Sequence, residues 1–445
     1  MLQKFLKFDS LGTVKQLAAG ALFMARDSDQ RLRVAIIGGG ISGNICGYLL
    51  HDSHDVTLFT ADSHNGGHTH THCIEFENRK LHVDTGFMVY NQRTYPFFVK
   101  LLERLGIRSK KSDMSFSVRC ERSNLEYSGS SVNGLFAQRS NVLRPAFYRM
   151  LLDILRFNRE APRALELCSD SLALQSYLIK NRYSDYFIQN YLVPLGASIW
   201  SARADRFLAF PLKFLIAFLD NHGLLQVRNR PQWYTIEGGA QRYVEVMTQG
   251  FKNSIRLDCP VERVDRSSDS VRLHTRSGAA LEFDRVIFAT HADTTLALLS
   301  KPTPKETEIL SQFEFQQNKA ILHTDQRLLP KSRRAWASWN YHVSDESAAP
   351  ASVTYDVNRL QSHGCSQPIC VTLNPTHEID EHHVIKKMLY RHPVFSTGTI
   401  TTQNRQQEIN GENNSFFCGA YWGFGFHEDG LRSGLAVAKC FGKEL

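Results

Sequence analysis

The chain has no Cys-x-x-Cys pair, although nine cysteines are scattered between Cys46 and Cys440. An odd, unpatterned set in a chain of 445 residues indicates reduced thiols and a cytoplasmic compartment. No apolar run approaches the roughly 20 residues that span a bilayer. The longest candidate, Phe207–Leu219, is interrupted by Pro211 and Lys213. We therefore expect a cytoplasmic protein without a membrane-spanning helix.

Internal repeats, low-complexity linkers and a dense basic stripe are also missing. The formal net charge is +8, and the one local concentration of positive charge is Arg104–Arg122. Nucleic-acid binding usually needs a denser stripe or a known module, so no nucleic-acid partner is expected. The positive balance favours some attraction to anionic surfaces or substrates, and the local concentration is interpreted as a solvated basic face.

What the sequence does contain is a strand that runs directly into a glycine turn. The segment Val34–Gly43 has an apolar strand followed by Gly38-x-Gly40-x-x-Gly43, and a helical pattern, Ile41–His51, opens within it. Gly38 permits the tight turn, Gly40 lets a pyrophosphate approach the backbone, and Gly43 lets helix and strand pack closely. The phosphates then lie at the positive end of the helix. This context predicts a dinucleotide-binding domain of the Rossmann type.

The second predicted strand, Val56–Phe59, departs from that pattern. An acidic residue usually follows this strand and binds the adenosine ribose, whereas here Thr60 follows, with Ala61 and Asp62 after it. A threonine hydroxyl binds a ribose hydroxyl less strongly than a carboxylate does. Either Thr60 or Asp62 makes the contact. No arginine stands nearby for a 2′-phosphate, so NADP is not favoured.

A glycine pair and several later segments resemble the flavin-containing amine oxidase superfamily, which includes protoporphyrinogen oxidase and phytoene desaturase relatives. In that superfamily a Gly-Gly pair and a basic residue line the FAD pyrophosphate, and Gly66-Gly67-His68 stands in the same place. The sequence is most similar to a bacterial branch of predicted NAD/FAD-binding proteins, over nearly the whole chain from Arg33. The other segments that carry this resemblance are Asp84–Pro96, Asn221–Leu225, Arg230–Trp233, Glu237–Tyr243 and Cys418–Gly434.

The resemblance implies that the dinucleotide is FAD, held by residues from both ends of the chain. Val261 stands where such flavoproteins contact the adenine edge. Asp429-Gly430-Leu431 is expected to open the last helix, whose positive end would stabilise negative charge on the reduced flavin. The candidate FAD contacts are Gly38, Gly40, Ile41, Ser42, Gly43, Thr60, Ala61, Gly66, Gly67, His68, Thr69, Gly86, Phe87, Met88, Val261, Ala289, Thr290, Gly419, Asp429, Gly430 and Leu431.

The resemblance also suggests residues for the chemistry. Lys319 stands where oxidases of the superfamily often carry a lysine that reaches flavin N5 through water; an ordinary strand-edge lysine is the alternative. Aromatic residues near the C-terminus resemble the wall that faces the isoalloxazine and excludes water, although core packing explains some of them equally well. These candidates are Tyr421, Trp422 and His427, with Phe424 and Phe426 beside them and Trp200 and Trp233 in the middle of the chain.

Three alternating histidines invite a second interpretation. On a strand, His68, His70 and His72 would share one face, as metal ligands do, but Cys73 would face the other way. A flavin-site histidine among polar strand residues is favoured, and no metal site is expected.

The expected fold class is α/β, with a discontinuous Rossmann-like FAD-binding domain, a mixed-sheet substrate domain and a helical insertion. Before this fold, Lys4, Lys7 and Lys15 precede the short apolar run Leu17–Ala25, a pattern shared by weak signal peptides and amphipathic surface helices. A peripheral membrane contact therefore stays open. The predicted limits are 1–32 for an N-terminal extension, 33–90, 233–295 and 405–445 for the FAD domain, 91–140 and 300–404 for the substrate domain, and 141–232 for the insertion.

The insertion is rich in phenylalanine and leucine, which favours an apolar, lipid-like substrate over a small charged metabolite. The resembled branch is often associated with fatty-acyl modification. The leading hypothesis is hydride abstraction from a C–H bond of an apolar small molecule by FAD, with reoxidation by oxygen or another acceptor. An amine oxidase is the nearest alternative and would need an aromatic cage. A non-catalytic flavin- or NAD-binding redox protein is left open by Thr60.

Overall fold

The computed structural model describes residues 31–169, 171–200, 203–226, 229–344 and 352–445. Within these ranges the strand that precedes the glycine turn lies inside a five-stranded sheet of order β10-β2-β1-β14-β20, in which every neighbouring pair is parallel. Its strands are β1 (Arg33–Ile37), β2 (Asp55–Phe59), β10 (Ile255–Arg256), β14 (Arg285–Phe288) and β20 (Ser415–Phe417). The start, the middle and the end of the chain thus build one sheet, as predicted for the Rossmann-like fold class.

Helices cover this sheet on both faces, which is why its strands read as continuous apolar runs. Val34, Ala35 and Ile36 of β1 are all fully buried. Helices α2 (Ile41–Leu50) and α16 (His427–Cys440) cover one face, and α12 (Ala292–Leu298) and α13 (Pro304–Leu310) lie on the other. Helix α11 (Gln241–Thr248) packs on α2. A small antiparallel sheet lies beside them and consists of β11 (Val261–Arg266), β12 (Val271–Thr275) and β13 (Ala280–Phe283).

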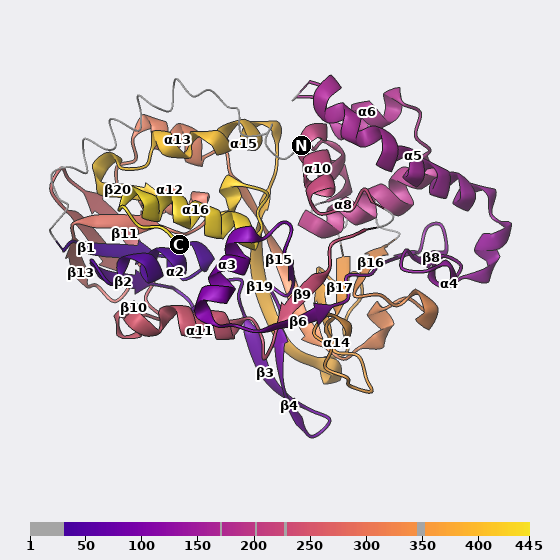
Figure 1. The fold of residues 1–445 in the computed structure, drawn as a ribbon, viewed down its shortest axis with the longest axis horizontal. Helices are drawn as coiled ribbons and strands as arrows, with labels where there is room; N and C mark the ends of the chain where they lie inside the picture. The colour runs from indigo at the N-terminus through magenta and orange to yellow at the C-terminus, as the bar shows by residue number, and fades with distance from the viewer. Residues whose placement is uncertain (1–30, 170, 201–202, 227–228, 345–351) are drawn as a thin grey trace.

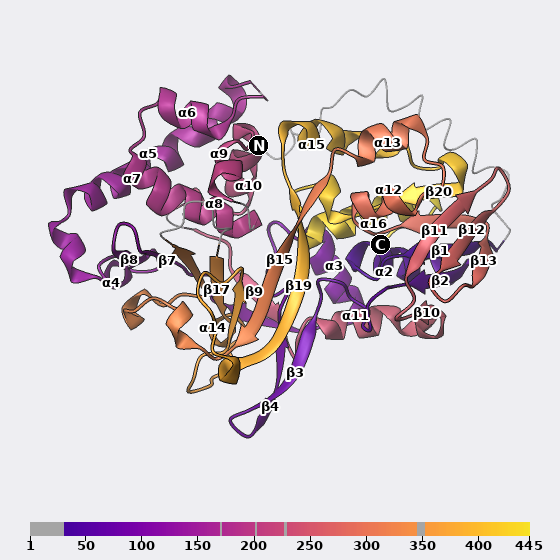
Figure 2. The same ribbon diagram turned by 180° about the vertical axis from the view of Figure 1, so that it is seen from behind.

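A seven-stranded mixed sheet of order β19-β15-β18-β17-β16-β7-β8 forms the second part of the molecule. Two long strands, β15 and β19, run from this sheet toward the parallel-sheet part, and both views show them between the two (Figures 1 and 2). The strands are β7 (Phe116–Cys120), β8 (Leu125–Ser128), β15 (Glu314–His323), β16 (Trp339–Val343), β17 (Ser352–Asp356), β18 (Cys370–Leu373) and β19 (Val384–Val394).

Helices pack against one face of the seven-stranded sheet, at the upper right of Figure 1. Their apolar side chains share a core with Val118 of β7, Tyr341 of β16 and Val353 of β17. The helices are α5 (Pro145–Leu167), α6 (Leu174–Lys180), α7 (Asp185–Phe187), α8 (Val193–Trp200), α9 (Ala204–Leu208) and α10 (Leu212–Asn221). All lie within the stretch that the sequence predicts to be helical.

Smaller elements lie between the two parts or at their edges. They are the hairpin β3 (Thr71–Phe76) and β4 (Arg79–Asp84), the sheet of β5 (Tyr90–Asn91), β9 (Trp233–Ile236) and β6 (Ser109–Ser112), and the helices α3 (Pro96–Leu105), α4 (Val132–Leu135), α14 (Val357–Leu360) and α15 (Thr397–Thr402). The β5-β9-β6 sheet pairs segments that the sequence assigns to two domains, so the predicted domain limits stay a prediction. The N-terminal extension lies, up to residue 30, outside the described residues.

Among the described residues, no helix combines the length and the apolar character needed to cross a membrane.

Close packing of α16 on α2 joins the two ends of the chain. A Cβ atom at Gly434 would lie 2.4 Å from Ile45 Cγ2 and 2.7 Å from the carbonyl oxygen of Ser42. The Ser42 hydroxyl also donates a hydrogen bond of 2.8 Å to the carbonyl of Gly430. Only glycine at these positions allows the two helices to approach so closely.

This packing predicts that Gly434→Ala destabilises the protein. Alanine normally stabilises a helix interior by about 1 kcal/mol over glycine, whereas overpacking costs about 1–3 kcal/mol. We expect thermal unfolding to show a lower Tm for Gly434→Ala. Gly129→Ala, whose Cβ meets nothing within 4 Å, serves as the control and should leave Tm nearly unchanged. A Tm of Gly434→Ala equal to or above the wild-type value contradicts the close packing.

Candidate functional site

A cavity of about 350 Å³ opens between the glycine turn and the seven-stranded sheet. One end is lined by the glycine turn and the strand ends of the parallel sheet, and the other end by the helical insertion and the mixed sheet. Eleven of the predicted FAD contacts line it: Gly40, Ile41, Ser42, Gly66, His68, Gly86, Phe87, Met88, Ala289, Thr290 and Gly419. Residues from distant parts of the sequence thus meet around one space.

The glycine turn leaves room for a phosphate. A Cβ atom at Gly40 would meet no atom within 4 Å, whereas one at Gly38 would lie 2.5 Å from the carbonyl oxygen of Ala289. Gly40 precedes α2, whose N-terminus carries neither a side-chain cap nor an acidic residue in its first turn. The backbone N–H groups there are open to an anion. These features fit the pyrophosphate of a dinucleotide.

Gly43 lies outside the cavity and serves packing instead. A Cβ atom at this position would lie 2.0 Å from the carbonyl oxygen of Gly38 and 3.2 Å from the Ala289 Cβ atom. Its lack of a side chain therefore lets α2 rest on the turn, as the motif predicts.

The Gly66-Gly67 segment is held against the glycine turn. The Gly66 N–H donates to the Gly39 carbonyl at 2.8 Å, and the side chains of Asn44 and Asn65 bind each other at 2.7 Å. A Cβ atom at Gly67 would lie 3.1 Å from the Gly40 Cα atom. The two glycine motifs, which are separate in the sequence, therefore form one wall of the site.

Thr60 is buried at the end of β2, where its hydroxyl accepts a bond of 3.3 Å from the Asp62 N–H. Ala61 and Asp62 are exposed, and neither these two nor Thr60 lines the cavity. Val261 in β11 does not line it either. The ribose and adenine contacts therefore stay predictions.

The His427 ring is held by an aromatic contact on one side and by a pair of hydroxyl groups on the other. Phe87 stacks on His427 with ring centroids 3.8 Å apart. His427 Nε2 lies 2.7 Å from the Tyr243 hydroxyl, which lies 2.7 Å from the Thr69 hydroxyl. Thr69 is thus a support beneath the cavity wall, because it is buried and does not line the space. Tyr421 and Phe426 line the cavity as well.

Histidines near the glycine-turn end of the cavity are uncharged. Burial lowers the pKa of His291, His392 and His427 to about 3 each, and it also lowers the pKa of His68. His68 Nε2 is buried and has no hydrogen-bond partner among the described residues. A cofactor oxygen or hydroxyl would satisfy it. The sequence pointed to His68 and His427, while His392 on β19 gave no signal.

Two of the proposed catalytic residues lie elsewhere. Lys319 is exposed on β15 and does not line the cavity, so the expectation that it reaches the flavin is not supported by its position. Strand alternation explains this, because the neighbouring Asn318 is the buried residue at this point. Trp422 is partly buried and packs against the core, with its ring centroid 4.9 Å from that of Phe313.

The last helix begins at His427, two residues before the predicted start at Asp429. Asp429 lies in the first turn, and its carboxylate accepts a bond of 3.0 Å from the Phe426 N–H. Glu428 reaches α3, where it accepts bonds from the N–H groups of Phe97 and Phe98. Asp429, Gly430 and Leu431 are buried and do not line the cavity, so they position the helix rather than touch the space.

A buried carboxylate, Asp84, fixes the loop that carries Gly86, Phe87 and Met88. It accepts hydrogen bonds from the Ala240 N–H at 2.9 Å, the Gln361 amide at 2.8 Å and the Thr71 hydroxyl at 2.5 Å. Burial raises the pKa of Asp84 from its usual value near 4 to about 7, which these donors partly oppose. Its role depends on Gln361, far away in the sequence, and the sequence alone does not reveal it.

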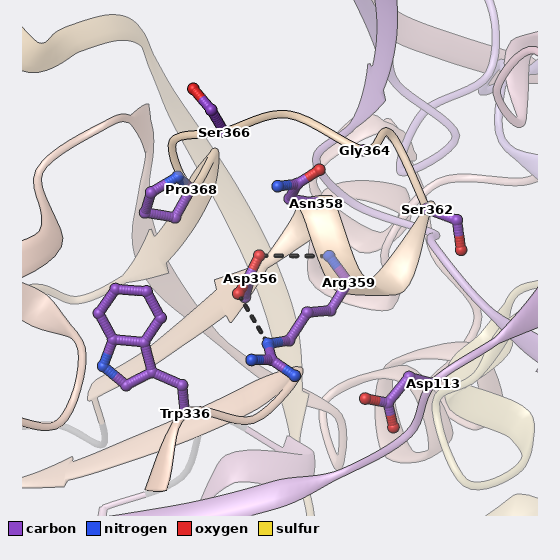
Figure 3. Close-up of a pocket in the computed structure, with 9 residues that line it drawn as sticks. All are labelled: Asp113, Trp336, Asp356, Asn358, Arg359, Ser362, Gly364, Ser366 and Pro368. Atoms are coloured by element: carbon purple, nitrogen blue, oxygen red, sulfur yellow. Dashed lines mark hydrogen bonds and ion pairs between the residues drawn. The ribbon is translucent and has the colours of Figure 1, made fainter. Parts of the chain in front are cut away.

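A second pocket, of about 470 Å³, lies behind the wall formed by β17 and α14 (Figure 3). Tyr355 and Leu360 line the main cavity, whereas the ion-paired Asp356 and Arg359 line this second pocket. Figure 3 shows Asp356 and Arg359 facing each other beside Trp336. The second pocket contains no glycine-turn residue, so the first cavity is the candidate cofactor site.

A family model described as "Flavin containing amine oxidoreductase" matches residues 41–367, well over half of the chain. The chain belongs to this family. The protein is thus a flavin-dependent oxidoreductase with FAD as its cofactor, and when bound FAD supplies the acceptor for a hydride. No sequence among the curated proteins matches the chain.

Several solved structures of flavin enzymes superpose on this amine oxidoreductase fold. A CLA-producing fatty acid isomerase from P. acnes gives a TM-score of 0.65 at 15% identity, over 92% of this chain and 98% of that chain. Cyclohexylamine oxidase from Brevibacterium oxydans IH-35A gives 0.66 at 14% identity, over 93% and 99%. Putrescine oxidase bound to putrescine gives 0.64 at 12% identity, over 92% and 98%. At such identities the likeness shows the fold.

The open space at Gly40 predicts a selective effect of Gly40→Ala. The backbone there has φ −76°, which alanine adopts freely, and the added methyl group meets no protein atom. We expect the cofactor-free protein to keep its Tm while the Kd for FAD, measured by flavin fluorescence, rises at least about tenfold, or about 1.4 kcal/mol.

Gly38→Ala is the matched comparison for this test. Its φ of +116° and its contact with Ala289 predict a lower Tm even without FAD. An unchanged FAD affinity in Gly40→Ala would remove the glycine turn from the pyrophosphate site.

Asp84 predicts a pH dependence of stability. Because its pKa is raised in the folded state, the folded protein holds this proton between about pH 4 and pH 7, while the unfolded chain releases it. The stabilisation is complete below about pH 4 and is lost as pH rises through about 7. The Tm of the wild type minus that of Asp84→Asn should therefore fall across this range. Asp269→Asn, at an exposed turn, is the control. A difference independent of pH contradicts the assignment.

Proposed function

We propose that this flavin enzyme takes hydride from a C–H bond of an apolar, lipid-like substrate. The observation that carries the proposal is the lining of the cavity beyond the glycine turn. Its apolar end is formed by Met114, Phe116, Leu195, Ile199, Trp200, Leu224, Trp233, Trp339, Leu360 and Leu373. Burying an alkyl chain against such side chains contributes about 25 cal/mol per Å² of apolar surface.

Charge in the cavity disfavours the amine oxidase alternative. Within the described ranges no aspartate or glutamate lines the cavity, and its histidines are neutral. An ammonium group would lose its water there without gaining a carboxylate. The charged side chain that lines the space is Arg391, which pairs with Asp293 and lies over the Phe315 ring at 5.5 Å. A carboxylate or a neutral polar head group therefore suits the part of the cavity near Arg391 better than an amine does.

His222 is a polar side chain that lines the cavity among the apolar residues. Its Nδ1 lies 3.0 Å from the carbonyl of Phe218, an acceptor, so Nδ1 carries the proton. Burial lowers the pKa of His222 to about 4, which leaves the ring neutral. Nε2 is then an acceptor that would orient a substrate hydroxyl or amide within an otherwise apolar space.

The other chain residues at the site position the reacting groups and exclude water. Phe87 stacked on His427 closes one side, and the hydrogen bond from Tyr243 fixes the His427 ring. Exclusion of water by these side chains would strengthen electrostatic interactions near the cofactor. Oxygen or another acceptor then reoxidises the flavin. A non-catalytic redox protein would need no such lined cavity beyond the cofactor.

Anaerobic bleaching of the yellow holoenzyme tests the proposal. We expect unsaturated long-chain fatty acids or their esters to reduce the bound FAD, and benzylamine or putrescine to leave it oxidised. Absorbance of the flavin is the measurement. Reduction by the amines and not by the lipids contradicts the proposal.

A narrowed cavity provides the matched variant. Ile199→Trp places a bulky indole ring in the apolar end of the cavity, while Ile179→Trp adds the same ring at a position that is 68% exposed. Ile199→Trp should bind FAD normally and lose at least about tenfold in the rate of bleaching by lipid. Equal rates for both variants would place the substrate outside this cavity.

A further inference from the structure

We propose that Glu121, His342 and His377 form a binding site for a divalent transition metal, with zinc as the best fit. The three residues lie together, and their ligand atoms are all within 4.8 Å of one another. They are far apart in the sequence, so no spacing motif indicates the site. The histidines that alternate near the glycine pair do not take part.

Strand pairing brings the first two residues together. β7 and β16 run parallel, with Arg119 opposite His342, and the Glu121 N–H donates to the Val343 carbonyl at 3.0 Å. His377 stands in the segment after β18. Because alternate strand residues face opposite sides of a sheet, His342 points away from the face on which Trp339 lines the cavity. The site is therefore separate from the flavin chemistry.

Two of the three distances between the ligand atoms suit a tetrahedral ion, and the third is at most 4.8 Å. His342 Nε2 lies 3.0 Å from Glu121 Oε1, and His377 Nε2 lies 3.1 Å from the same oxygen. Zinc bonds to nitrogen and oxygen are about 2.0–2.2 Å, which sets neighbouring ligands roughly 3.3 Å apart. Two imidazoles and one carboxylate leave the fourth position for water, and His377, whose side chain is 50% exposed, gives that water access.

An unsatisfied nitrogen points independently to a ligand. The His342 side chain is only 3% exposed, and its Nε2 faces Glu121 Oε1 at 3.0 Å without the geometry of a regular hydrogen bond. Nδ1 lies 2.6 Å from the Thr376 hydroxyl, which fixes the ring. Metal-bound histidines almost always hold their second nitrogen in this way. An ion at Nε2 would satisfy a buried atom that otherwise costs free energy.

Arg119 is the competing cation. Its Nη2 lies 3.4 Å from Glu121 Oε1, and its Nη1 donates to the carbonyls of Arg327 and Leu329. Those two carbonyls hold the guanidinium in place when the carboxylate turns to an ion. Imidazole and carboxylate ligands together select zinc over magnesium or calcium, which prefer oxygen alone. The ion would tie β7, β16 and the segment after β18 together.

Zinc binding to the chelator-treated holoenzyme tests the site. We expect wild-type protein to bind one equivalent of ZnCl₂ more than His377→Gln, by calorimetry, and its Tm to rise by at least about 2 °C at saturation. His377→Gln should keep the metal-free Tm, because its side chain is half-exposed. Glu121→Gln should also lose the equivalent. His382→Gln, an exposed histidine outside the cluster, should keep it.

Two results would overturn the site. One is an equal number of zinc equivalents in wild type and His377→Gln. The other is a rise in Tm with MgCl₂ as large as that with ZnCl₂, which would indicate a general effect of divalent salt. A visible spectrum of the Co²⁺-loaded wild type typical of four-coordinate cobalt, lost in His377→Gln, would support the tetrahedral arrangement.

Discussion

The contact between α2 and α16 is the constraint on which the rest of the structure depends. Gly434 and the Ser42–Gly430 hydrogen bond let the last helix lie directly against the helix that follows the glycine turn. Through Glu428 the same helix also caps the start of α3. One helix from the end of the chain thus fixes the phosphate end of the site and places His427 at the cavity wall.

The two ends of the cavity differ in the side chains that line them. Its flavin end is lined by neutral histidines and glycine backbone, while its far end is lined by the side chains of the mixed sheet and the helical insertion. The buried carboxyl group of Asp84 lies beneath the loop that carries Phe87 and supports the wall without lining the cavity. A cavity lined mainly by apolar and uncharged side chains favours hydride removal from an apolar substrate over recognition of an ammonium ion.

Local sequence signals predicted the fold, and eleven of the proposed FAD contacts line the cavity. The glycine turn, the Gly-Gly pair and the apolar strands are local patterns that can be recognised within a few residues. The structure has the parallel sheet and the helical region that these patterns predict. The role of Lys319 is still a prediction: its side chain is exposed, and strand alternation makes the neighbouring Asn318 the buried one. His392, Asp84 and the Glu121–His342–His377 cluster depend on contacts between segments that only the folded chain brings together. The ribose contact at Thr60 or Asp62 is still a prediction.

The central claim is that an alkyl chain lies between the flavin and the helical insertion. A crystal structure of the FAD-bound protein with a long-chain unsaturated fatty acid, grown without oxygen, tests it most directly. We expect the acyl chain along Leu195, Trp233 and Trp339, with a carbon atom about 3–3.5 Å from flavin N5. An acyl chain bound elsewhere, with water filling this end of the cavity, would contradict it.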